Sequence, residues 1–221
     1  MVNPAMRPVA FPVVHELDGW DLFWIRVRTI PGKEKELAAL RRATGDRARS
    51  AFTAEGLASH PTVAALRGLF RAAGCDPTRY RPSSEALLRR VLKGEDLPAI
   101  HPLVDLNNCL SATLAVPCCV VREGSFTPPV VLRAGTAGES YESLRGPFNL
   151  EGKPLLADAA GPFGTPITDS RRVKVTDETG RAWMVAYLPR DLVTPEATGE
   201  ALDELLAAAP VASVEESGAS R

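Results

Sequence analysis

The sequence predicts an α+β fold, with helices dominating the first half of the chain and strands the second. After one early strand, helical patterns run from Lys33 to Ala115, whereas short apolar runs typical of strands follow from Cys118 onward. Because helices and strands do not alternate regularly, we expect a mostly antiparallel or mixed sheet. The 221 residues are enough for one large domain or for two small domains that share a core.

The early strand is expected at Asp21–Ile30, where apolar Phe23, Ile25 and Val27 alternate with Trp24 and two arginines. Such alternation predicts a strand with one face in the core and one in solvent. Helical spacing, together with flanking Pro and Gly residues, places the helices. We expect helices at Lys33–Arg42, Pro61–Gly74, Ser83–Lys93 with Ser83 or Ser84 as the N-cap, Asp105–Ala115 and Pro195–Ala209.

Short apolar segments in the second half predict strands. They are expected at Cys118–Val121, Val130–Arg133, Pro154–Ala157, Arg172–Thr176 and Trp183–Leu188. The last two are expected to form a hairpin closed by the turn at Asp177–Gly180. For the domain organisation, we expect an N-terminal arm over residues 1–20, a single domain over 21–210 and a flexible tail over 211–221.

Composition indicates a globular protein that is soluble. Hydrophobic residues make up 45% of the chain and charged residues 24%, so we do not expect disorder throughout. No apolar run is long enough to span a bilayer, and the N-terminus lacks the basic and apolar segments of a secretory signal. We therefore expect a cytoplasmic protein without a membrane partner.

The net charge of −1 is unevenly distributed along the chain. Residues 1–94 carry 16 Lys and Arg against nine Asp and Glu, whereas residues 95–221 carry 10 against 18. A basic half attracts phosphates. Solvated arginine faces of the helices explain the same excess without any ligand, so charge alone leaves both interpretations open.

Signatures of common cofactor and catalytic sites are missing from the sequence. It has no G-x-G-x-x-G, no G-x-x-x-x-G-K, no G-x-S-x-G and no H-E-x-x-H motif. Cys75, Cys109, Cys118 and Cys119 form no C-x-x-C pair, and we expect them to be small buried residues. We therefore expect neither a metal nor a cofactor.

Two polar clusters remain as candidate sites. In the first, His101–Asn108, Asp105 or Asn107 can cap a helix, or the adjacent amides of Asn107 and Asn108 can hold an amino group, a hydroxyl or a water. The second begins at Asp158 and continues over 164–172 with small residues, hydroxyls, one carboxylate and two arginines. It suits either a ligand-binding loop or a capped polar turn.

Three segments of the chain resemble freestanding B3/B4 domain proteins. They are YRPSSEALLRRVLKG at Tyr80–Gly94, LPAIHPLVDLNNCLS at Leu97–Ser111 and GPFGTPITDSRR at Gly161–Arg172. Val104–Asn108, followed by Pro117, also resembles the editing module of the phenylalanyl-tRNA synthetase beta subunit, where V-D-x-T-N opens a helix and G-Q-P-x-H-A-F-D follows. The resemblance covers roughly residues 20–190 and implies a B3/B4-like fold.

The same resemblance implies roles for individual residues. Asp105 and Asn108 match the aspartate and asparagine of V-D-x-T-N and Asn107 replaces the threonine, which implies catalytic roles for all three. Cys119 stands where the synthetase has its histidine, and Arg122 where it has an aspartate. Substrate contacts are expected from His101, Cys119, Asp158, Gly164, Thr165, Asp169 and Ser170. Phosphate contacts are expected from Arg71, Arg89 and Arg90.

The resemblance favours one function and leaves two alternatives. The synthetase module hydrolyses the ester of a wrongly attached tyrosine, which implies a trans-acting editing hydrolase here, one that binds the acceptor end of mischarged tRNA and does not bind DNA. The alternatives are a non-catalytic binding module for an amino acid or related metabolite, and a biosynthetic enzyme that uses the same scaffold on an amino-acid-like substrate. In each case we expect Cys119 to shape the pocket by its size and to perform no covalent step, because its apolar surroundings favour a protonated thiol.

Overall fold

The computed structural model describes residues 8–221, so residues 1–7 of the expected N-terminal arm lie outside the described residues. The helices are α1 (Glu34–Ala51), α2 (Pro61–Ala72), α3 (Ser83–Leu92), α4 (Pro102–Leu114) and α5 (Pro195–Ala208), with short 3-10 turns η1 (Leu57–Ser59) and η2 (Arg171–Val173). The strands are β1 (Val13–His15), β2 (Trp20–Thr29), β3 (Cys118–Arg122), β4 (Val130–Ala134), β5 (Ser140–Ser143), β6 (Gly146–Asn149), β7 (Pro154–Asp158), β8 (Gly161–Gly164), β9 (Arg181–Pro189) and β10 (Ala212–Ser220). The predicted α+β class is confirmed.

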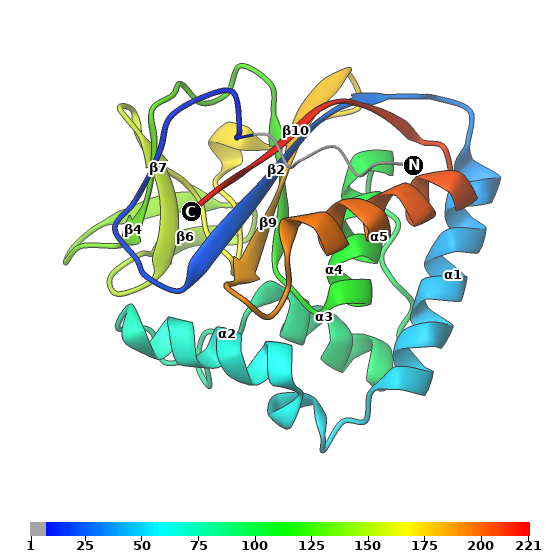
Figure 1. The fold of residues 1–221 in the computed structure, drawn as a ribbon, viewed down its shortest axis with the longest axis horizontal. Coiled ribbons are helices and arrows are strands. Elements are labelled where there is room, and N and C mark those ends of the chain that lie inside the picture. Colours follow the sequence, from blue (N-terminus) through cyan, green and yellow to red (C-terminus); the bar gives the residue numbers. More distant parts are fainter. Residues whose placement is uncertain (1–7) are drawn as a thin grey trace.

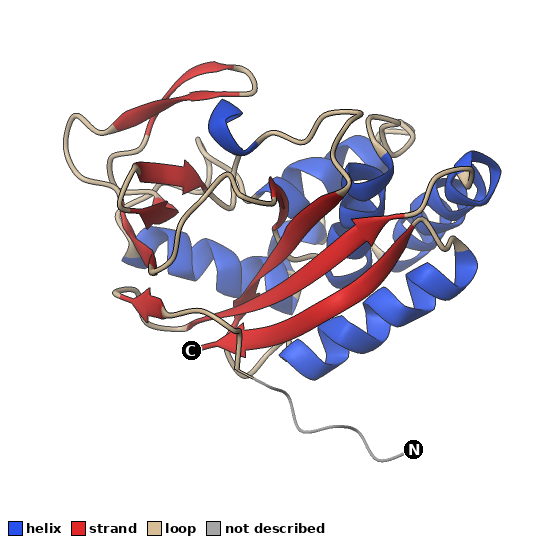
Figure 2. Cartoon of the chain, turned by 90° about the horizontal axis from the view of Figure 1, so that it is seen from above, coloured by secondary structure: helices blue, strands red, loops and turns tan. Residues whose placement is uncertain are grey.

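The central sheet has the strand order β10-β2-β9-β3, and every neighbouring pair is antiparallel. Figure 2 shows its long strands lying side by side across one face of the helical layer. A second sheet, β1-β4-β7-β8, has one parallel pair, β1 with β4, and two antiparallel pairs. The strands β5 and β6 form a separate hairpin. The sheets are therefore mostly antiparallel with one mixed sheet, as predicted.

The two faces of the central sheet bury different cores. Helices α1, α3, α4 and α5 cover one face, and α2 with the second sheet covers the other (Figure 1). Ile25 and Met184 face the helices, whereas Trp24 and Val185 face the second sheet. The prediction of a half-buried strand at 21–30 was therefore wrong, since Trp24 is fully buried. Alternation of apolar and aromatic residues marks a strand with two covered faces here, because a second apolar layer lies against the presumed solvent side.

The predicted hairpin of residues 172–176 with 183–188 is absent from the described structure. Residues 171–173 form η2, in which the Ser170 hydroxyl accepts a hydrogen bond from the Arg172 N–H at 3.2 Å. The Arg172 guanidinium in turn binds the Asp158 carboxylate at 3.0 Å. These polar contacts fix a turn where the sequence suggested a strand. The neighbours of β9 are β2 and β3, so its partners come from distant segments.

The last residues form a strand and are not the flexible tail that the sequence suggested. β10 pairs with β2 from Ala212 opposite Thr29 to Ser220 opposite Leu22, and it lies beside β2 in Figure 1. A polar run can form an edge strand because pairing joins backbone N–H and C=O groups, and charged side chains are common on sheet edges. Glu215 gives this edge a charged anchor, since its carboxylate lies 2.9 Å from the Arg181 guanidinium. Part of the expected arm is also a strand, β1.

One predicted helix start and one predicted helix cap were also wrong. α4 begins at Pro102, three residues before the predicted Asp105, and its N-cap is His101, whose ring Nδ1 accepts a hydrogen bond from the Leu103 N–H at 3.2 Å. Pro102 at the first helical position needs no hydrogen-bond acceptor, which favours this earlier start. α3 begins after Pro82 without a side-chain cap, so neither Ser83 nor Ser84 has the predicted capping role. Among the described residues, no helix has the length and apolar character needed to cross a membrane.

Candidate functional site

A cavity with a volume of about 460 Å³ lies beside the predicted motifs. It lies where α3, α4 and the beginning of β3 meet, at the edge of the central sheet. Asn108 comes from α4, Cys118 from β3 and Ile167 from the loop that follows β8. Both polar clusters of the sequence therefore contribute to one cavity, and its size suits a small ligand.

The cavity is basic at its mouth and neutral inside. Its charged members are four exposed arginines, Arg79, Arg81, Arg90 and Arg145. Its less exposed members are neutral, and they include Tyr80, Val104, Asn108, Ser111, Cys118 and Ile167. Within residues 8–221 no carboxylate lines the cavity. An anion at the mouth would therefore meet positive charge without opposing negative charge from the lining.

The Glu85 carboxylate is the centre of an ion-pair cluster that includes one arginine of the mouth, Arg81. The Glu85 carboxylate of α3 is fully buried and lies 2.9 Å from the Arg89 guanidinium. The guanidinium groups of Arg67 and Arg81 lie 3.6 and 4.0 Å from the same carboxylate. Arg67 belongs to α2 and Arg81 to the segment before α3, so Glu85 joins α2, α3 and one arginine of the mouth.

The loop after β8 is attached to the start of α3. The Ser83 N–H donates a hydrogen bond to the Pro166 carbonyl at 2.8 Å. Within the loop, the Thr165 hydroxyl donates to the Thr168 carbonyl at 2.7 Å and accepts from the Thr168 N–H at 3.0 Å. These bonds set the loop so that Ile167 reaches the cavity, while Thr165 itself is buried in the turn.

Helix α4 supplies one wall through residues spaced four and three apart, Val104, Asn108 and Ser111. Such spacing puts side chains on one face of a helix. The start of this helix is fixed by Asp105, whose buried carboxylate accepts hydrogen bonds at 2.8 Å from both the Ile100 N–H and the Arg41 guanidinium. Asp105 therefore connects α1, the loop before α4 and α4 itself.

Adjacent Cys118 and Cys119 belong to different environments because β3 alternates its side chains between the two sheet faces. Cys118 lines the cavity, and its thiol lies 3.6 Å from the Val116 carbonyl. The Ser111 hydroxyl donates to the same carbonyl at 2.7 Å. Burial raises the pKa of the Cys118 thiol, so the cavity presents a neutral sulfur.

Cys119 lies in the other core, next to Tyr187, with 4.0 Å between its thiol and the tyrosine hydroxyl. Burial, followed by the nearby Asp169 carboxylate, raises the pKa of the Cys119 thiol well above its ordinary value. The prediction that the Cys119 thiol is protonated agrees with this raised pKa. The expectation that Cys119 shapes the cavity was wrong, because Cys118 and not Cys119 is among the lining residues.

The carboxyl group of Asp169 is buried near Tyr141 and Tyr187. A Cβ atom added at Gly164 would lie 3.3 Å from Asp169 Oδ1 and 3.4 Å from the Tyr187 hydroxyl, so the turn accommodates glycine there. Asp169 Oδ1 has no hydrogen-bond partner in the described residues. Burial raises the pKa of Asp169 to about 8. This carboxyl group is therefore protonated at neutral pH.

The structure distributes the predicted site residues among several places. Asn108 and Arg90 line the cavity, whereas His101 and Asp105 line a neighbouring depression of about 270 Å³ with Arg41. The buried Asn107 amide donates to the Cys118 carbonyl at 3.1 Å, and this bond joins α4 to β3. The remaining predicted substrate contacts, Cys119, Asp158, Gly164, Thr165, Asp169 and Ser170, are not among the residues that line either hollow.

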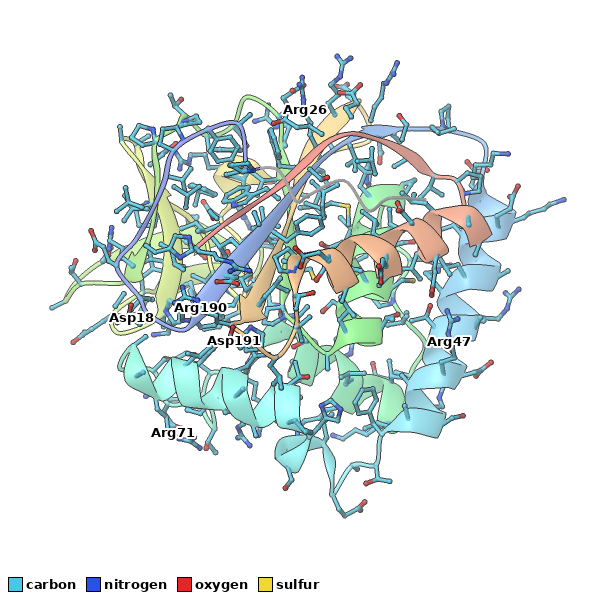
Figure 3. All side chains as sticks on the ribbon, viewed as in Figure 1. Asp18, Arg26, Arg47, Arg71, Arg190 and Asp191 are labelled. Carbon is cyan, nitrogen blue, oxygen red and sulfur yellow. The ribbon has the colours of Figure 1, made fainter. Side chains whose placement is uncertain are left out.

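The predicted phosphate contacts differ in their surroundings. Arg90 lies at the cavity mouth and its guanidinium is 2.8 Å from the Glu95 carboxylate. The Arg89 guanidinium forms an ion pair with the Glu85 carboxylate at 2.9 Å. Arg71 lies on the solvent side of α2 and is not among the cavity residues (Figure 3).

Sequence reasoning missed several lining residues, chiefly Arg79, Tyr80, Arg81, Ser111, Cys118 and Arg145. A signal was present at Arg79–Arg81, because arginines on both sides of an aromatic residue are typical of segments that bind phosphates. Cys118 could have been separated from Cys119 by strand alternation. Nothing in the sequence around Arg145 marks it, because the hairpin β5–β6 reaches the mouth only through the tertiary fold.

The described residues contain no group of three or more His, Cys, Asp and Glu that could hold a metal ion. The polar groups at the cavity are guanidinium donors, the Asn108 amide, the hydroxyls of Tyr80, Ser83 and Ser111, and a protonated thiol. Such groups bind anions and orient carbonyl or water oxygens.

The B3/4 domain family matches the chain over residues 65–204, a range that includes every segment lining this cavity. The chain belongs to the B3/4 domain family. The resemblance stated from the sequence is therefore confirmed at the level of the family. The match leaves out β1, β2, α1 and β10, although β2 and β10 belong to the central sheet.

One solved structure is similar to this member of the B3/4 domain family along most of the chain. An N-terminal fragment of the phenylalanyl-tRNA synthetase beta subunit from Pyrococcus horikoshii is similar with a TM-score of 0.46 and 13% sequence identity. The similarity covers 97% of this chain and 51% of the fragment, so the chain spans about half the length of that structure. The comparison with curated proteins gave no match.

Proposed function

We propose that the chain is a trans-acting editing hydrolase that cleaves the aminoacyl ester of mischarged tRNA. The observation that carries the proposal is the cavity with four arginines at its mouth and a neutral interior. The acceptor end of an aminoacyl-tRNA has matching chemistry, since phosphates lie on one side of the ester and an amino-acid side chain on the other. Membership of the B3/4 domain family supports the same substrate class.

In the proposed complex the terminal phosphates contact Arg79, Arg90 and Arg145 at the mouth of the cavity. The Asn108 amide holds the attacking water or the ester carbonyl, and a hydroxyl of the terminal ribose assists the water. Guanidinium donors stabilise the negative charge that develops on the carbonyl oxygen. The catalytic roles that the resemblance implies for Asp105 and Asn107 become, in this proposal, the support of α4 and β3 around Asn108.

The principal alternative is a non-catalytic module that binds a free amino acid or a related metabolite. It is favoured by the nature of the lining, because among the described residues the cavity presents no ionised carboxylate and no activated thiol. A guanidinium group binds a free carboxylate as readily as a phosphate. A biosynthetic enzyme acting on an amino-acid-like substrate would need the same anion contacts and remains the third candidate.

The proposal is tested by deacylation of a panel of mischarged tRNAs with the purified chain, alongside calorimetry with the free amino acids. We expect release of at least one amino acid by the wild-type chain and loss of release in an Asn108→Ala variant. The control is Thr113→Ala, an exposed substitution on α4 that is not among the cavity residues. Binding of a free amino acid without any deacylation would instead establish the binding module.

A further inference from the structure

The inner part of the cavity is more specific than a general anion site. Ser111 is buried there, and Asn108 and Cys118 are half-buried, whereas the arginines are exposed. The Ser111 hydroxyl and the Cys118 thiol are both directed at the Val116 carbonyl, so their protons are already engaged. A ligand group that enters this end meets apolar surface, oxygen and sulfur lone pairs and the Asn108 amide, and no counter-charge from the lining.

We infer that the inner end of the cavity selects an uncharged amino-acid side chain, and that Cys118 sets the largest side chain that fits. This inference rests on the proposed function, because it assumes that an aminoacyl group is the part of the ligand that enters. A charged side chain would lose its water without gaining a partner, which strongly disfavours its binding. A cationic side chain would in addition pass the arginines of the mouth.

The position of Cys118 explains why this residue limits size. It stands at the first position of β3, and the Asn107 amide fixes its backbone by a hydrogen bond to its carbonyl. Val104 and Ser111 of α4 and Ile167 of the loop line the same cavity. The loop is in turn attached to α3 by the Ser83–Pro166 hydrogen bond, so the walls around Cys118 have little freedom to move apart. A larger side chain at this position would therefore take volume from the ligand.

The test uses non-hydrolysable aminoacyl amides of adenosine that carry alanine, leucine, tyrosine, lysine or glutamate, with binding measured by calorimetry. The wild-type chain should bind at least one of the three uncharged amides at least about tenfold more tightly than the lysine and glutamate amides. Of the leucine and tyrosine amides, Cys118→Met should weaken the larger one that the wild-type chain binds at least about tenfold, and it should weaken the alanine amide by less than about threefold. Cys118→Ala should retain or improve the binding of the larger amides.

The matched control is Cys109→Ala, which removes a buried thiol of α4 that packs in the helical core and does not line the cavity. It should leave the order of the amides unchanged. Thermal unfolding of each variant identifies any loss of fold, and Cys118→Ala keeps the test valid should the methionine variant not fold.

Two negative outcomes are distinguishable. Equal weakening of all amides by Cys118→Met, or tight binding of the lysine or glutamate amide, would overturn the inference while leaving an editing function intact. Failure of the wild-type chain to bind any amide, together with no deacylation of any mischarged tRNA, would overturn both the proposed function and the inference.

Discussion

Cys118 and Cys119 are adjacent in the chain, yet one lines the basic cavity and the other lies in the core beside Tyr187. Strand alternation separates them, because neighbouring residues of β3 face opposite sides of the central sheet. Cys119, for which the sequence resemblance implied a substrate contact, therefore does not line the cavity, and Cys118 does. In the inference above, Cys118 is therefore the β3 residue that limits the size of the ligand.

Cys119→Ala should leave the maximal rate of deacylation within about tenfold of the wild-type rate, a barrier change of about 1.4 kcal/mol. The reason is that burial keeps the Cys119 thiol protonated and that its side chain does not line the cavity. The measurement is single-turnover deacylation at saturating enzyme, with mass spectrometry to detect an adduct. Loss of all activity in the folded variant, with a covalent adduct on the wild-type thiol, would show a thiol enzyme instead.

Substitution of the mouth arginines should change how tRNA binding depends on salt. Arg79→Gln and Arg145→Gln should each reduce the slope of log affinity against log salt by about 1, because each removes one phosphate contact. Arg47→Gln is the matched control, since Arg47 is exposed on α1 and is not a cavity residue (Figure 3). Filter binding of tRNA at several salt concentrations gives the slopes. Unchanged slopes in both variants would show that tRNA binds at another surface of the chain or does not bind to it.

Arg89→Glu should destabilise the fold and is therefore a poor probe of RNA binding. It places a second carboxylate beside the fully buried Glu85, whose closest cation at 2.9 Å is Arg89 itself. We expect the free energy of unfolding to fall by roughly 3 kcal/mol, the lower end for a broken buried pair, because Arg67 and Arg81 remain nearby. Urea unfolding measures this loss, and Arg90→Glu, on the same helix but exposed, should cost much less.

The Asp105–Arg41 pair should show strong energetic coupling. Its two charged groups are 2.8 Å apart, and both side chains are largely buried. A double-mutant cycle with Asp105→Asn and Arg41→Met should give a coupling energy of roughly 2 kcal/mol in urea unfolding. An energy near zero would show that Asp105 does not stabilise the fold through Arg41. The rate constant of deacylation, measured where all variants are folded, tests separately the catalytic role that the resemblance implies.

The fold class and most helices were predictable because they follow from local periodicity. α2 and α5 lie where Pro at the first turn and helical spacing placed them. β10 was not predictable in this way, since the polar run ASVEESGAS becomes a strand only by pairing with the exposed edge of β2. The hydrogen bonds that define β10 come from residues almost the whole chain length away, and no local pattern records them.

The candidate site was predictable only in part for a related reason. Asn108 and Arg90 belong to segments whose resemblance to the family is visible in the sequence. Arg79 and Arg145 reach the mouth from different segments that only the folded chain brings together. Asp105 looked like a capping or catalytic group, and its bonds to the Ile100 N–H and the Arg41 guanidinium depend on α1 packing against α4. The residue types showed that these positions are polar. Which groups their side chains bind is decided by tertiary contacts.

Asp169 should make the fold less stable as the pH rises. Its pKa in the folded chain is raised from 3.8 to about 8 by burial, so the folded state holds one more proton than the unfolded state between these values. Its contribution to stability is complete below the unfolded pKa and is lost as the pH rises to about 8. Each pH unit in this window lowers the free energy of unfolding by at most about 1.4 kcal/mol.

Urea unfolding at pH 5 and pH 8 checks this prediction with Asp169→Asn, which is neutral at both values. The decrease in the free energy of unfolding between the two should be smaller for the variant than for the wild-type chain. Asp191→Asn is the control, because Asp191 is exposed and asparagine tolerates its positive φ of 63°. An identical decrease in the wild-type chain and in Asp169→Asn would show that the Asp169 carboxyl group ionises in the folded chain well below pH 8.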